Sequence, residues 1–199
     1  IATANGCSRA AETFTITINP KGQVNTISNL VACDGETVTI PAFTTSNTVG
    51  TTTYTWTNSN TAIGLAASGT GNISSFTATN LGSTPITATI TVVPTFTNGG
   101  VSCVGTSKSF TITVNPTAQV NQPNNSVFCA GTSSTAIPFS TSNSGGTVTY
   151  NWTNNSPAIG LSATGTGNIP IFTTVNDTNN PIIATITVTP TFANGGKNC

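Results

Sequence analysis

The sequence predicts an all-β protein built from two tandem β-sandwich repeats. Three observations predict it: short segments alternate apolar residues with threonine, turn residues separate these segments, and the chain matches itself at an offset of 96 residues. Threonine, valine and isoleucine favour strands, whereas asparagine and glycine favour turns. No segment has its apolar residues at the 3.6-residue helical period, so we expect essentially no helix.

The offset aligns the cysteines and the tryptophans without a gap: Cys33 with Cys129, Cys103 with Cys199, and Trp56 with Trp152. A unit of about 100 residues is the size of one sandwich domain that folds alone. The phase of the match sets the expected boundaries. Residues 1–20 correspond to the closing strand of a preceding repeat, 21–116 to the first repeat, and 117–199 to a second repeat that lacks its last strand.

The expected strands of the first repeat follow in order: 37–45, 51–57, 75–79, 85–92 and 110–114. Segment 85–92 places its apolar residues on one face and its threonines on the other. Asn98-Gly99 predicts a type I′ hairpin before the last strand. Pro116 ends that strand, because proline cannot continue the pairing.

The displaced phase has two interpretations. The chain is a piece of a longer array of repeats, or segment 8–18 completes the open sheet of another copy by strand donation.

Several sequence blocks lie at 54–58, 62–65, 69–73, 88–91 and 14–17, and the second copy carries them again at 150–154, 158–161 and 165–169. These blocks resemble the PKD-like (Ig-like) repeats of Bacteroidota surface proteins. The resemblance implies an immunoglobulin-like sandwich and a place in very long, SprB-type gliding-motility adhesins that are exported by the type IX secretion system. Trp56-Thr57-Asn58 departs from the acidic stretch of the archetypal PKD domain, so nothing known of that stretch carries over.

Composition argues against catalysis. The chain has no histidine, and its four acids disagree between the copies: Glu12 aligns with Lys108, Asp34 with Ala130, Glu36 with Thr132, and Asp177 with Leu81. We therefore expect no enzyme activity, no cofactor and no metal site, and we interpret Asp34-Gly35-Glu36 as a solvated turn rather than a calcium loop. The net charge is zero, which argues against nucleic acid as a partner. The sequence contains no apolar run long enough to predict insertion into a membrane.

The aromatic pairs allow two interpretations. Trp56 and Trp152 each lie two residues after a tyrosine, Tyr54 and Tyr150, in an expected strand. These side chains form either the sandwich core or a platform for sugar rings, and the core is the favoured interpretation.

The five cysteines predict disulfides of an exported protein. One pairing lies within the repeats, Cys33–Cys103 and Cys129–Cys199, and assigns Cys7 to a neighbouring repeat. The other joins the two repeats through Cys33–Cys199. The first pairs more of the cysteines, whereas the second suits the expected ends of a sandwich, and the sequence leaves both open.

Together these features predict a non-enzymatic structural and adhesive repeat of an extracellular, cell-surface adhesin. Its partners would be neighbouring repeats of the same chain and a surface polysaccharide or substratum. A subunit of a self-assembling fibre and an accessory binding module of a secreted polysaccharide hydrolase are the alternative functions.

Overall fold

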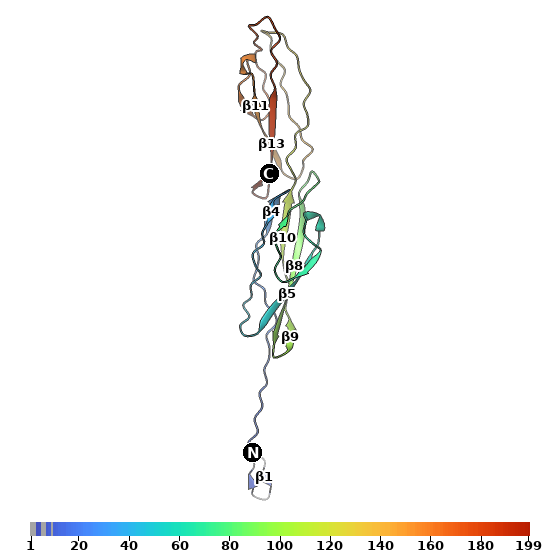
Figure 1. The fold of residues 1–199 in the computed structure, drawn as a ribbon, viewed down its shortest axis with the longest axis vertical. Coiled ribbons are helices and arrows are strands. Elements are labelled where there is room, and N and C mark those ends of the chain that lie inside the picture. The colour runs from blue at the N-terminus through green and yellow to red at the C-terminus, as the bar shows by residue number, and fades with distance from the viewer. Residues whose placement is uncertain (1–2, 5–6, 9) are drawn as a thin grey trace.

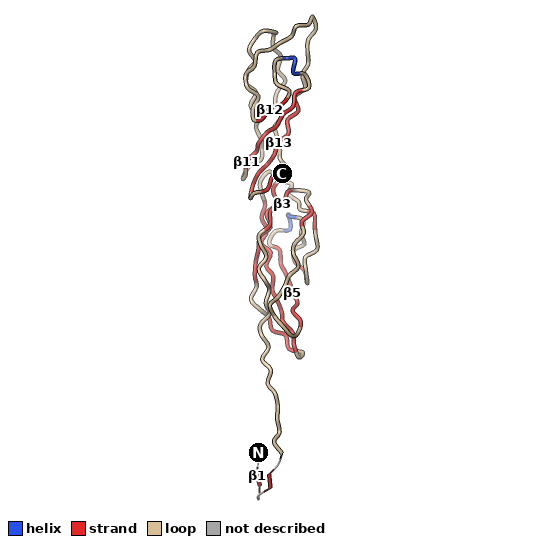
Figure 2. The backbone as a smooth tube through the Cα atoms, turned by 90° about the vertical axis from the view of Figure 1, so that its left-hand side faces the viewer, coloured by secondary structure: helices blue, strands red, loops and turns tan. Residues whose placement is uncertain are grey.

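The structure, a computed structural model, describes residues 3–4, 7–8 and 10–199. It is all-β, as the sequence predicts, and its two short helices, η1 (Thr61–Ile63) and η2 (Pro157–Ile159), are single 3-10 turns. Two domains follow one another along a single line, and an extended segment leads away from the first domain (Figure 1). The C-terminus lies between the two domains in both views (Figure 2).

The first domain is built on one six-stranded sheet. Its strands are β3 (Leu30–Cys33), β10 (Lys108–Asn115), β8 (Ile86–Asn98), β5 (Thr51–Asn58) and β6 (Ser68–Thr70), with β9 (Val101–Val104) paired to the far end of β8. β10 pairs with β8 antiparallel and with β3 parallel, so it is hydrogen-bonded on both edges. A separate two-stranded sheet pairs β4 (Thr37–Val38) with β7 (Phe76–Thr77).

The core of this domain follows from the alternation of apolar residues and threonine. Ala88, Ile90 and Val92 of β8 are at most 2% exposed, and the threonines between them face outward. Side chains from β10 and from the segments on the other side of the core join them in one apolar cluster, as in a β-sandwich. The expected hairpin forms one residue later than Asn98-Gly99 predicts: Asn98 ends β8, and the two turn residues are Gly99 and Gly100, with φ of 58° and 76°.

The second domain has a four-stranded sheet. Its strands are β12 (Thr164–Thr166), β11 (Thr147–Asn154), β13 (Ile186–Asn194) and β14 (Lys197–Asn198). β11 and β12 begin 96 residues after β5 and β6. β13 begins four residues later than the same offset from β8 would place it. In β8 these first four residues pair with β10, and the second sheet has no strand in that position.

In the described part of the N-terminal segment, β1 (Thr3–Ala4) and β2 (Cys7–Ser8) precede an extended stretch at residues 10–20. That stretch is the part of the chain expected to be the closing strand of a preceding repeat. Within the described residues it belongs to no sheet, and its apolar side chains Phe14, Ile16 and Ile18 are 86%, 76% and 85% exposed.

Candidate functional site

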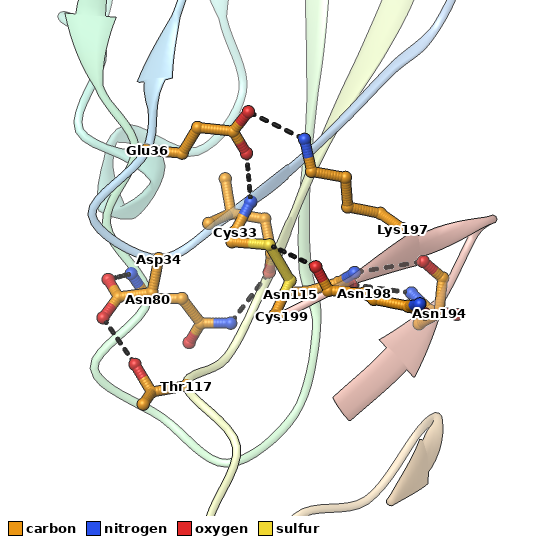
Figure 3. The surroundings of a disulfide bond; sticks show 11 residues. Cys33, Asp34, Glu36, Asn80, Asn115, Thr117, Asn194, Lys197, Asn198 and Cys199 are labelled. Carbon is orange, nitrogen blue, oxygen red and sulfur yellow. Dashed lines mark hydrogen bonds and ion pairs between the residues drawn. A yellow bond between two sulfur atoms is a disulfide. The ribbon is translucent and has the colours of Figure 1, made fainter. Parts of the chain in front are cut away.

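The contacts between the two domains converge on one disulfide. Cys33 ends β3 of the first domain, and Cys199 follows β14 at the end of the last hairpin of the second. Their Cα atoms are 5.5 Å apart, a separation typical of disulfides (Figure 3). The bond is one of the two pairings that the sequence leaves open. It joins the domains instead of closing either one.

The other expected pairing, Cys33–Cys103 with Cys129–Cys199, is wrong. Cys33 lies opposite Asn115, next to the start of β8, whereas Cys103 lies opposite Phe96 near its end. Ten residues of β8 separate Ile86 from Phe96, or about 33 Å at the rise of an extended strand. No disulfide spans that distance.

Two asparagines form a reciprocal pair beside the disulfide (Figure 3). The Asn115 amide donates to the backbone carbonyl of Asn194 at 3.0 Å, and the Asn194 amide donates to the Asn115 side-chain oxygen at 2.9 Å. Asn115 is fully buried, so its hydrogen bonds are needed to offset its loss of water. The pair attaches the last residue of β10 to the last hairpin of the second domain.

The turn Asp34-Gly35-Glu36 contributes both of its carboxylates to the domain interface. Asp34 accepts from the backbone N–H of Asn80 at 2.8 Å and from the Thr117 hydroxyl, at the start of the second domain, at 3.0 Å. Glu36 accepts from Lys197 of β14 at 2.7 Å and from the backbone N–H of Cys33 at 2.9 Å. The expected turn is present, and its acids face protein donors rather than solvent alone.

The Lys197 ammonium and the Cys33 N–H hold the pKa of Glu36 below its ordinary value, because both stabilise the ionised carboxylate. A lowered folded-state pKa adds stability above the ordinary pKa of 4.5, and this is lost as the pH falls through the folded pKa. The carboxylate is 38% exposed, so water and salt weaken the pair.

Glu36→Gln is therefore expected to remove a small part of the stability, below about 1 kcal/mol. The difference from the unmodified chain should be present at neutral pH, shrink as the pH falls below 4.5, and vanish once the pH is below the folded-state pKa of Glu36. Urea unfolding across this pH range measures it. Glu12→Gln is the matched control, because Glu12 is exposed on the extended segment. A difference that does not decrease in acid would contradict the assignment.

Among the cysteines whose side chains the structure describes, two are free: Cys103, half-buried on β9 at the far end of the first domain, and Cys129, exposed on the second domain. They are the 96-residue counterparts of Cys199 and Cys33. The side chain of Cys7 lies outside the described part of the chain.

The two Trp side chains are buried and present no exposed face to a sugar ring. Trp56 and Trp152 are 7% and 4% exposed, and the close approach of Gly69 and Gly165 leaves no room for a Cβ over either indole. Tyr54 is half-buried and packs edge-on against Phe43. Tyr150 makes the equivalent contact with Phe139.

Sequence reasoning missed the asparagine pair and the ion pair. Asn115 and Asn194 align with Asn19 and Asn98 at the 96-residue offset, and this repetition could have indicated that the asparagines interact. The ion pair gave none, because Glu36 and Lys197 align with Thr132 and Val101 in the other copies.

No family model and no curated protein matches the chain. Within the described residues, no helix is long and apolar enough to cross a membrane. The same residues hold no group of three or more His, Cys, Asp or Glu side chains arranged to hold a metal ion. Structural disulfides are typical of oxidising compartments, so the Cys33–Cys199 bond indicates an exported protein.

Proposed function

We propose that the chain is a non-enzymatic spacer and adhesive unit from a longer array of immunoglobulin-like, PKD-like repeats on a bacterial cell surface. The cross-linked joint carries this proposal. A disulfide, an asparagine pair and an ion pair together hold the second domain in line with the first, and a linker meant to swing freely would need none of them. Repeating the joint gives a stiff fibre that projects from the cell.

The surface supports the adhesive part of the proposal. Only four residues are basic and four acidic, so hydroxyl and amide groups provide most of the polar contacts that the exposed strands can offer. Such contacts to a polysaccharide are weak one by one, and they are multiplied by copy number along an array. Gliding motility and attachment through an adhesin of the SprB type are the functions that this design suits.

Small-angle X-ray scattering tests the spacer. The reference protein carries Cys103→Ser and Cys129→Ser, which remove the free thiols and leave the joint disulfide intact, and at low concentration it is expected to scatter as a single extended rod. Adding Cys33→Ser and Cys199→Ser should give a shorter, broader distribution of interatomic distances, because the joint can then bend. Identical profiles for the two proteins would show that the disulfide does not set the geometry.

A further inference from the structure

The second domain has an open groove where the first domain holds β10. The groove has a volume of about 820 Å³, and its lining combines polar residues with apolar side chains, among them Phe128, Phe139, Ile182, Ile186 and Val188. Ala88, Ile90 and Val92, beneath β10, are buried, whereas their counterparts Ala184, Ile186 and Val188 are half-exposed.

The edge strands that β10 would join are also changed. Residues 126–129, the counterpart of β3, form no strand, and Val127 is 96% exposed. Residues 182–185 belong to no strand either. Both segments correspond to residues that pair only with β10 in the first domain. The groove therefore presents two unpaired backbone edges along an apolar floor, which is the usual receptor for an added strand.

The extended N-terminal segment carries apolar side chains that match those of β10. Phe14, Ile16 and Ile18 alternate with polar residues and are more than three-quarters exposed. Their 96-residue counterparts are the side chains of β10 that fill the first domain, Phe110, Ile112 and Val114, and these are at most 4% exposed. Residues 14–17 and 110–113 are the same tetrapeptide, Phe-Thr-Ile-Thr.

The hydrogen bonds between the end of this segment and the first domain also match those between β10 and the second domain. Asn19 donates to the backbone carbonyl of Asn98 at 2.8 Å, and Asn98 donates back to the Asn19 side-chain oxygen at 3.0 Å. This is the Asn115–Asn194 pair shifted by 96 residues. A strand donated by residues 12–19 would therefore lead into its own first domain as β10 leads into the second.

We propose that copies of this 199-residue chain join end to end in trans, as consecutive repeats of a longer array would join in cis. Residues 12–19 of one copy fill the groove in the second domain of another copy, and Cys103 of the donor then bonds to Cys129 of the acceptor. The register of the first domain places Ile16 opposite Ala184 and Asn19 opposite Cys129. Cys103 follows the donor's Asn98 as Cys199 follows Asn194, so the two free thiols meet as Cys33 and Cys199 do. Figure 1 shows the extended N-terminal segment and the second domain, whose residues line the groove, at opposite ends of the molecule, so the product is a head-to-tail polymer.

The bond requires an oxidant. The Cys103 and Cys129 thiols each lose a proton, and a thiolate attacks a low-molecular-weight disulfide to give a mixed disulfide and one released thiol. The second thiolate displaces the other small thiol. The small disulfide has then gained two electrons as two thiols, and the protein has one new disulfide.

Mixed-isotope cross-linking tests the proposal. Equal amounts of unlabelled and ¹⁵N-labelled chain are incubated with oxidised glutathione, and the products are resolved on a non-reducing gel and digested for mass spectrometry. We expect a ladder of multimers and Cys103–Cys129 peptides that join light to heavy copies. Cys129→Ser should remove the ladder.

Two variants separate strand donation from chance collision of thiols. Ile16→Asp places a charge where the apolar groove would receive it and should lower the multimer yield roughly tenfold or more. Thr15→Asp adds the same charge on the opposite face of the segment and should leave the yield nearly unchanged. Both variants fold, because neither residue belongs to a domain core.

A peptide of residues 10–20 supplies a readout that needs no thiol. It should raise the unfolding temperature of the second domain, followed by Trp152 fluorescence, whereas a scrambled peptide should not. A chain that gives no multimers, equal yields from the two variants, or no shift with the peptide would overturn the inference. The proposed spacer function would stand in each case, since it depends on the Cys33–Cys199 joint.

Discussion

Replacing Cys33 and Cys199 together by serine is expected to lower the free energy of unfolding of the second domain by about 4–5 kcal/mol. Cys33 lies opposite Asn115 in the parallel ladder, so the disulfide ties the end of the second domain back to its beginning. When that domain unfolds, residues 116–199 remain a closed loop of about 84 residues, and closure of a loop this long strongly limits the unfolded chain.

This loss should be large relative to the total free energy of unfolding of the second domain. Its core side chains Ala184, Ile186 and Val188 are half-exposed, so less apolar area is removed from water than in the first domain. Without the bond this domain is expected to unfold at a markedly lower guanidinium concentration.

Guanidinium unfolding followed by Trp152 fluorescence, in a Trp56→Phe background, measures the difference. The reference protein carries Cys103→Ser and Cys129→Ser, which remove the free thiols and leave the joint intact. Equal midpoints with and without the joint disulfide would show that the second domain is stabilised by its own packing alone.

The sequence predicted much of the local structure because each local feature has a local cause, although only Thr37–Val38 of the expected strand 37–45 forms. Alternating threonine predicted 51–57 and 85–92, and the structure has β5 and β8 there. Asn98-Gly99 predicted the hairpin, which forms one residue later. β3 was missed, although Leu30-Val31-Ala32 is a short continuous apolar run, because its ladder is parallel and its only partner, β10, lies some 80 residues away.

The joint could be predicted only in part. The cysteine offset limited the pairings to two, but choosing between them needed the length of β8, which lies between Cys33 and Cys103. The Glu36–Lys197 ion pair joins residues 161 apart in the sequence, and no local pattern marks either one. Contacts between domains depend on how two finished surfaces meet, and residue spacing alone does not contain that information.

Ile112→Ala should strongly destabilise the first domain, whereas Ile16→Ala should leave its stability almost unchanged. Both substitutions change the third residue of the same Phe-Thr-Ile-Thr sequence. Ile112 is fully buried between Ala88 of β8 and Leu30 of β3. Truncating a buried isoleucine costs about 2–5 kcal/mol, because apolar contact is lost and a cavity remains. Ile16 is 76% exposed and outside both cores, so its truncation should change the stability by less than about 0.5 kcal/mol.

Unfolding of the first domain, followed by Trp56 fluorescence in a Trp152→Phe background, separates the two variants. The comparison holds composition and local sequence constant and changes only the place of the strand in the fold. An equal loss from both substitutions would mean that residues 12–19 pack against the first domain of their own chain. They would then be unable to reach a groove in another copy, so this measurement also tests the proposed joint between chains.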